Sequence, residues 1–352
     1  MYKINTRSTV NAVGFCALLG FGIANAAPGD AEISANAGPW PITIKTCAHD
    51  AGAICSLTWR GKQFIDDYDH GRQLQSAAAF DFEKPPSQWF PNTEVYNPTE
   101  AGAANVVNGN AINPSPSSSV LQGMWTTSNA LATQTKMAYF IPFNNRKVSD
   151  HILNKQVTIG AHGLAHVIEY LTLFTVPTAQ QSADYIPSHN AQFEALTAYM
   201  PAEFSKIYTV DMLTAAVTPI SWQIQNPGGV TYERNKPLIV ATPCTNPAAT
   251  QCSDNYAMGI FSPDLPQASP YLDAGYGSFR HSADPADGEL ANRFPDNVVK
   301  INTVYRYTNP SGQYGFRTYV VIGSLDNVRI SMQQLYSLCN PSSCGWPSAR
   351  LQ

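Results

Sequence analysis

The chain has 352 residues, of which only 13% are charged, and its formal net charge at pH 7 is −4. This acidic balance argues against nucleic acid as a partner, because a phosphate-binding surface needs an excess of basic side chains.

The N-terminus reads as a secretory signal peptide over residues 1–26. Lys3 and Arg7 precede an uncharged apolar run over residues 12–23, and Ala24-Asn25-Ala26 fits an A-x-A cleavage site. The run is too short to span a membrane as a helix. We therefore expect an exported protein, secreted or periplasmic, with no membrane partner. Cleavage would leave 19 basic against 25 acidic side chains, a net charge of −6.

Six cysteines follow the signal peptide, and they fall in three close pairs. In an exported chain this spacing predicts three short-loop disulfides, although six cysteines also allow other connectivities. A zinc site is the weaker interpretation, because no C-x-x-C occurs. We expect no metal and no cofactor. The predicted pairs are Cys47 with Cys55, Cys244 with Cys252, and Cys339 with Cys344.

Twenty-six prolines, six of them preceded by Asn, interrupt the chain at short intervals and leave little room for long helices. No long linker divides residues 27–352, so we expect a single domain there. The predicted fold class is all-β: a large antiparallel β-sandwich with long loops and few short helices.

The first half of the chain alternates predicted strands with long loops. An Arg60-Gly61 turn joins two of these strands. Residues 77–119 show no hydrophobic periodicity of a strand or helix, which indicates a functional loop or an unrecognised element. The strand at 166–176 is apolar on both faces, which favours a central position. The predicted strands are residues 42–46, 52–59, 62–65, 131–141, 152–159 and 166–176.

In the second half, residues 190–200 are predicted to form a short helix that Pro201 ends. Residues 297–307 and 314–322 are predicted to pair as a hairpin, because Pro310 and Gly312 suit the turn between them. Residues 328–338 are expected to form a final helix. Further strands are predicted at residues 206–210, 217–225, 238–242 and 257–261.

Residues 66–75 form the densest polar run of the chain, Asp-Asp-Tyr-Asp-His-Gly-Arg-Gln-Leu-Gln. A loop so composed, at the end of strands, is a natural ligand site. The alternative is a solvated loop in which the Asp residues make turns and Arg72 pairs with a carboxylate.

Other patches could complete a site if the fold brings them together. One pairs Arg280 with His281, and another places Glu194 near Tyr199. Glu194 could equally pair on the surface while Tyr199 packs. The i,i+4 pair His162 and His166 is read as turn and strand histidines rather than a metal site, because glycines surround His162.

No nucleotide, serine-hydrolase, zinc-protease or calcium motif occurs. The remaining groups suit sugar chemistry. A lyase needs a cation or amide to neutralise a uronate and a Tyr or His to take the α-proton. A glycosidase needs two carboxylates, and an epimerase needs a carboxylate base and a His. Exposed aromatic rings supply flat faces on which sugars stack.

Residues near the start of the mature chain resemble a known superfamily. Ala51-Gly52-Ala53-Ile54-Cys55-Ser56-Leu57, followed by residues 59–65, resembles the opening of galactose-mutarotase-like β-supersandwich proteins. The resemblance implies an Arg-bearing loop over a sugar site, with Arg72 as that arginine. It also implies central strands near residues 166–176 and a site histidine near residues 189–194.

The leading interpretation is a secreted enzyme that cleaves an extracellular polysaccharide or glycan as a lyase or hydrolase. The alternatives are a secreted aldose-epimerase-like enzyme and a non-catalytic carbohydrate-binding module. The sequence does not predict the oligomeric state. The candidate catalytic residues are His70, Arg72, Glu100, Glu194, Tyr199 and His281, and the candidate substrate-binding residues are Tyr68, Gln75, Trp89, Tyr96, Asn97, Trp125 and Arg280.

Overall fold

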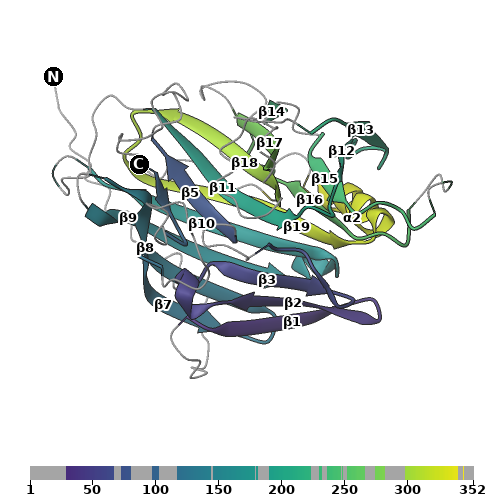
Figure 1. Ribbon diagram of the computed structural model, residues 1–352, viewed down its shortest axis with the longest axis horizontal. Coiled ribbons are helices and arrows are strands. Elements are labelled where there is room, and N and C mark those ends of the chain that lie inside the picture. Colours follow the sequence, from purple (N-terminus) through teal and green to yellow (C-terminus); the bar gives the residue numbers. More distant parts are fainter. Residues whose placement is uncertain are drawn as a thin grey trace, which may run out of the picture.

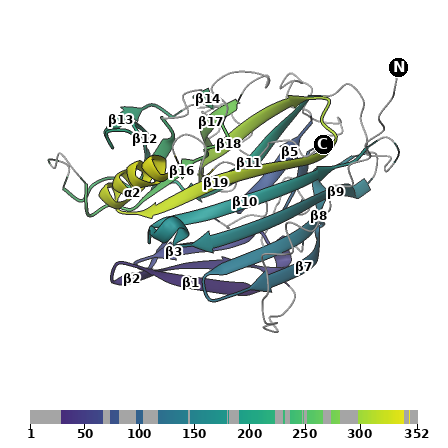
Figure 2. The same ribbon diagram turned by 180° about the vertical axis from the view of Figure 1, so that it is seen from behind.

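The strands fold into two facing layers, seen from opposite sides in Figures 1 and 2. The 19 described strands form one hydrogen-bonded sheet, and all the pairings between them are antiparallel. This architecture agrees with the predicted all-β sandwich. The computed structural model describes residues 29–66, 73–80, 97–102, 117–143, 146–178, 180, 190–222, 230–231, 236–246, 248, 252–265, 274–281, 298–339 and 344.

The first layer is built around β11. β11 pairs with β18 on one side and β5 on the other, and β17 and then β14 extend the layer beyond β18. β5 leads to β3, which pairs with β4 and with β2, and β2 pairs with β1. The strands are β1 (Ala31–Ala37), β2 (Trp40–Thr46), β3 (Ile54–Trp59), β4 (Lys62–Gln63), β5 (Leu74–Ala79), β11 (Asn190–Pro201), β14 (Val230–Thr231), β17 (Ala274–His281) and β18 (Val298–Thr308).

The second layer is centred on β10, which lies between β9 and β19. On one side the order continues through β8 to β7, and on the other through β16, β15 and β12 to β13. β6 (Pro98–Thr99) pairs with both β5 and β8 and so links the layers. The strands are β7 (Val120–Thr126), β8 (Ala130–Phe143), β9 (Arg146–Ile159), β10 (Val167–Val176), β12 (Lys206–Val210), β13 (Val217–Ile220), β15 (Leu238–Ala241), β16 (Ala257–Phe261) and β19 (Gly312–Gly323).

Aromatic side chains fill the space between the layers. Phe193 of β11 lies 5.1 Å, centroid to centroid, from Phe174 of β10. Tyr305 of β18 lies 4.3 Å from Phe316 of β19. All four rings are at most 1% exposed, so each anchors its strand to the opposite layer. Because inward and outward residues alternate along a strand, this packing also determines which side chains face outward.

The predicted helix at residues 190–200 is wrong, since these residues form β11. Phe193, Leu196 and Ala198 are buried in the interlayer core. The backbone of β11 forms hydrogen-bonded ladders with β18 on one side and β5 on the other. Local sequence suggested one apolar helical face, but pairing with two neighbouring strands decided the outcome.

The predicted hairpin is also wrong, although both strands are present. Within the fully described β18 and β19, no ladder joins the two: β18 pairs with β11 and β17, and β19 pairs with β10 and β16. The Asn309–Gly312 connection therefore passes from one layer to the other. Positive φ at Asn309 and Gly312 allows this change of direction.

Most other strand predictions are confirmed. Residues 206–210 and 257–261 form strands with the predicted bounds, and β10 holds the central position expected of its apolar sequence. The final helix is present as α2 (Leu325–Leu338), which starts earlier than predicted because Ser324 and Asn327 form a capping box. α2 packs on the outer face of β16 and β19 through Val328, Met332 and Leu335.

The three predicted disulfides, Cys47–Cys55, Cys244–Cys252 and Cys339–Cys344, are all present. In the part of the chain that the structure describes, no helix has the length and apolar character needed to cross a bilayer. The predicted signal peptide lies outside the described residues.

Candidate functional site

A polar cluster lies on the outer face of the first layer, on β11. Phe193, Leu196 and Ala198 point into the core, and the alternating residues Glu194 and Thr197 point outward. A bulge between Glu194 and Leu196 shifts the register, and the Thr197 hydroxyl donates to Glu194 Oε2 over 2.6 Å. Tyr199 continues the same outward row. Two predicted catalytic residues, Glu194 and Tyr199, therefore share one face.

Lys300 of the neighbouring strand β18 completes the cluster. Its Nζ lies 2.8 Å from Glu194 Oε2 and 5.2 Å from the centre of the Tyr199 ring. The side chains of Lys300 and Glu194 are only 8% and 13% exposed. The cation and the carboxylate are thus held together with little contact with water, beside a partly exposed phenol.

Amide groups surround this pair. Gln192 Nε2 donates to Glu194 Oε1 over 3.1 Å, and Arg306 Nε donates to Gln192 Oε1 over 3.0 Å. Asn302 also hydrogen-bonds Glu194. Its neighbour on β17 is Gly277, where a Cβ would lie 2.2 Å from Asn302 Oδ1, so only glycine leaves room for this amide.

Both members of the pair are held in their charged forms. Burial raises the pKa of Glu194, but Lys300, Thr197 and Asn302 together lower this pKa below its ordinary value. Burial lowers the pKa of Lys300, but Glu194 and Tyr199 together raise it above its ordinary value. Glu194 can therefore accept hydrogen bonds or a proton near neutral pH, and it is not available there as a general acid.

The polar stretch 66–75 is anchored beside this cluster at both ends. Asp66 N–H donates to the Tyr199 carbonyl over 3.0 Å, while Gln75 pairs with Thr197 across the β5–β11 ladder. Gln75 Oε1 also accepts from Ala101 N–H over 3.0 Å. These two anchors place the ends of the polar stretch beside β11. Residues 67–72, with Tyr68, His70 and Arg72, lie outside the described residues.

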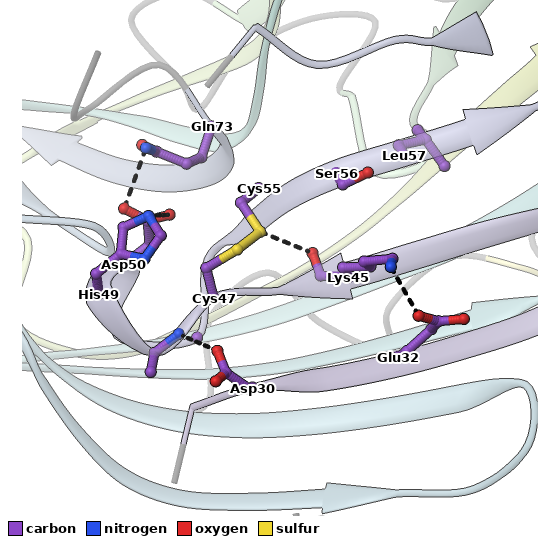
Figure 3. The surroundings of a disulfide bond; sticks show 12 residues. Asp30, Glu32, Lys45, Cys47, His49, Asp50, Cys55, Ser56, Leu57 and Gln73 are labelled. Atoms are coloured by element: carbon purple, nitrogen blue, oxygen red, sulfur yellow. Dashed lines mark hydrogen bonds and ion pairs between the residues drawn. A yellow bond between two sulfur atoms is a disulfide. The ribbon is translucent and has the colours of Figure 1, made fainter. Parts of the chain in front are cut away.

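A disulfide-closed turn supports the second anchor, as Figure 3 shows. Cys47–Cys55 closes the turn that carries Asp50, a fully buried carboxylate. Asp50 Oδ1 accepts from Gln73 Nε2 over 3.2 Å, and His49 Nε2 lies 3.3 Å from Asp50 Oδ2. This disulfide therefore helps to position the end of the polar stretch.

Glu100 does not join the outer cluster. It is fully buried and forms an ion pair with Lys155, which is also fully buried and donates to the Gly52 carbonyl over 2.7 Å. Ser76 N–H donates to Glu100 Oε2 over 3.2 Å, and the Tyr170 hydroxyl lies 3.5 Å from the same oxygen. Burial raises the pKa of Glu100 more than Lys155 lowers it. Glu100 occupies the interior between the layers.

The other candidates are spread over the molecule. Arg280 is exposed on β17, and His281 ends that strand opposite Val298. Asn97 precedes β6, and its carbonyl accepts from Phe140 N–H over 2.9 Å. Trp125 lies on β7, in the other layer. Trp89 and Tyr96 lie outside the described residues.

His162 occupies a turn, as predicted, with a φ of 55° between two glycines of positive φ. Its Nε2 lies 2.7 Å from the Tyr319 hydroxyl. It also lies near the sulfurs of Cys339 and Cys344, but these are joined to each other and offer no thiolates.

Sequence reasoning did not identify Lys300, Gln192, Asn302 or Arg306. The signal for Lys300 was a charged residue within Val-Val-Lys-Ile-Asn-Thr-Val, an otherwise apolar strand. A charge at such a position needs a partner when the strand is buried. Its partner Glu194 lies on a strand that is distant in the sequence.

In sequence, the chain matches no protein-family model and no curated protein. In structure, it is similar to a heparinase III at 9% identity and a TM-score of 0.35, covering 86% of this chain and 36% of that one. A structure named as a mutarotase from Salmonella typhimurium has 8% identity and a TM-score of 0.36, covering 86% of this chain and 96% of that one. A 4-alpha-glucanotransferase from Thermococcus litoralis has 8% identity and a TM-score of 0.32, covering 84% and 40%. The chain thus spans about a third of the length of the heparinase III, and likenesses this distant carry no argument about function.

Proposed function

We propose that the protein is a carbohydrate-active enzyme, a polysaccharide lyase that acts on a uronate-containing glycan outside the cell. The proposed site is the outer face of β11 and β18. The observation that carries the proposal is the position of Lys300, with its ammonium 2.8 Å from Glu194 and 5.2 Å from the centre of the Tyr199 ring.

In this proposal, Lys300, held in place by Glu194, donates a further N–H to the uronate carboxylate, which makes the α-proton easier to remove. Tyr199, acting as a phenolate, takes that proton, a double bond forms in the sugar ring as the bond to the glycosidic oxygen breaks, and the Tyr199 phenol then returns the proton to the departing oxygen. Glu194 holds Lys300, Gln192 holds Glu194, and both bind sugar hydroxyls. Tyr68, His70 and Arg72, which lie between the two anchors of the polar stretch, are further candidates to contact the substrate.

The electrostatics favour a lyase over a glycoside hydrolase. A hydrolase needs one carboxylic acid that stays protonated and a second carboxylate close by. The lowered pKa of Glu194 keeps it ionised, and the described partners of Glu194 are Gln192, Thr197, Lys300 and Asn302, none of them a carboxylate.

The test is incubation with a panel of uronate-containing and neutral polysaccharides, reading reducing ends and the ultraviolet absorbance of unsaturated uronate together. We expect both signals on a uronate polymer. Tyr199→Phe should abolish them, and Lys45→Met, a change in an exposed pair with Glu32, should not. Reducing ends without absorbance would indicate a hydrolase. Neither signal on any polymer would favour an epimerase or a binding module.

A further inference from the structure

The outer face of the second layer carries a feature that the proposed catalytic face does not use. Leu131, Leu153 and Val157 point into the core, so the alternating residues of β8 and β9 point outward. Two rows cross these strands, because Trp125 pairs with Ala132 and Ala132 with Gln156, while Gly123 pairs with Gln134 and Gln134 with Asn154. We call these six residues the Trp125 face. β7, β8 and β9 lie toward the viewer in Figure 2.

The Trp125 ring lies flat along this face. A Cβ built at Gly123 would come within 2.8, 3.3 and 3.4 Å of three atoms of the ring, so the ring covers the glycine. Its other neighbour, Ala132, is also small. The side chain of Trp125 is nevertheless 46% exposed, so one aromatic surface remains open to solvent. A shallow hollow beside the ring is lined by Thr126, Thr127, Ala130 and Gln156.

Amides adjoin the ring. Gln134 Nε2 donates to Asn154 Oδ1 over 2.9 Å, which orients both side chains, and Gln156 lies in the row of Trp125. All three amides are partly exposed. The Trp125 face itself contains no charged residue, and the nearby Lys136 is neutralised by Asp150 at 2.8 Å.

We propose that the Trp125 face is a binding site for an uncharged polysaccharide. The C–H face of a pyranose ring packs on a flat aromatic surface, and oriented amides exchange hydrogen bonds with its hydroxyl groups. An uncharged surface favours a neutral sugar over a uronate. The site is separate from Lys300 and Glu194, because the aromatic core lies between the two outer faces.

The test is affinity electrophoresis of the folded protein in native gels that contain hydroxyethylcellulose, xylan, galactomannan or pullulan, with polygalacturonate as the charged comparison. We expect at least one neutral polymer to retard the protein. Trp125→Ala and Gly123→Val, which displaces the ring without removing it, should each weaken that binding at least tenfold. Gln156→Ala should weaken it less. Melting temperatures should stay close to that of the parent.

Two control variants distinguish binding at the Trp125 face from binding elsewhere on the protein. Trp40→Ala removes a tryptophan that is 50% exposed on β2, and it should leave retardation unchanged. Tyr199→Phe alters the opposite face and should also leave it unchanged. The proposal is overturned if no neutral polymer retards the parent, if Trp125→Ala binds as well as the parent, or if Tyr199→Phe loses binding.

Discussion

Lys155 and Glu100 form a buried ion pair, and the loss of either charge should destabilise the fold strongly. Both side chains are fully buried between the layers. Lys155 forms an ion pair with Glu100 and also donates a hydrogen bond to the Gly52 carbonyl. Replacing Lys155 with methionine keeps an unbranched side chain and removes the ammonium. Glu100 then keeps contacts with Ser76 and Tyr170 but has no cation.

Removing one member of a buried ion pair costs about 3–5 kcal/mol, because the other charge stays in a medium that solvates it poorly. We therefore expect Lys155→Met to lower the free energy of unfolding by about this amount near pH 8. The double variant Glu100→Leu/Lys155→Met should recover most of the loss, because well-packed apolar residues replace such pairs at little cost.

The loss of unfolding free energy in Lys155→Met should be larger at high pH than at low pH. Burial raises the pKa of Glu100 above its ordinary value of 4.5, and without Lys155 this pKa rises further. A raised carboxyl pKa gives a contribution to stability that is complete below about pH 4.5 and is lost as the pH rises through the folded-state pKa. The deficit of Lys155→Met should therefore be smaller at pH 5 than at pH 8.

The assay is urea unfolding with linear extrapolation at both pH values. Lys45→Met is the matched control, since the Lys45–Glu32 pair is 51% and 57% exposed and should contribute less than about 1 kcal/mol. A single variant as stable as this control, or a double variant as unstable as the single one, would refute the stabilising role of the buried pair.

Three further predictions concern other parts of the molecule. Thiol labelling of the denatured, unreduced mature protein should find no free cysteine, and labelling of two or more would contradict the three disulfides. Burial lowers the pKa of His151 to about 3, so the free energy of unfolding should fall as the pH drops from about 6.5 toward 3. In acid unfolding curves, His151→Leu should reduce this fall by up to about 1.4 kcal/mol per pH unit. An unchanged pH profile would contradict this role of His151. Gly277→Ala should displace Asn302 and lower kcat/KM of the proposed lyase at least tenfold, with little change in melting temperature. Full activity of this variant would show that Asn302 has no part in the reaction.

Local sequence was sufficient wherever a strand has strong patterning of its own. β12 and β16 have the predicted bounds, because short β-branched or apolar runs bounded by loops favour strands whatever their partners are. Close spacing likewise predicted the cysteine pairs, since nearby cysteines can meet without help from the rest of the fold.

Tertiary structure decided what depends on distant partners. β11 is a strand because β5 and β18 flank it, although its own sequence also suits a short helix. β18 and β19 pair with other strands because each packs its aromatic residues against the opposite layer. Lys300 meets Glu194 only through the register of β11 with β18, and Trp125 lies flat only because Gly123 and Ala132 are its neighbours in the sheet. A strand pattern specifies which side chains share a face, but long-range pairing specifies which strands bring those faces together.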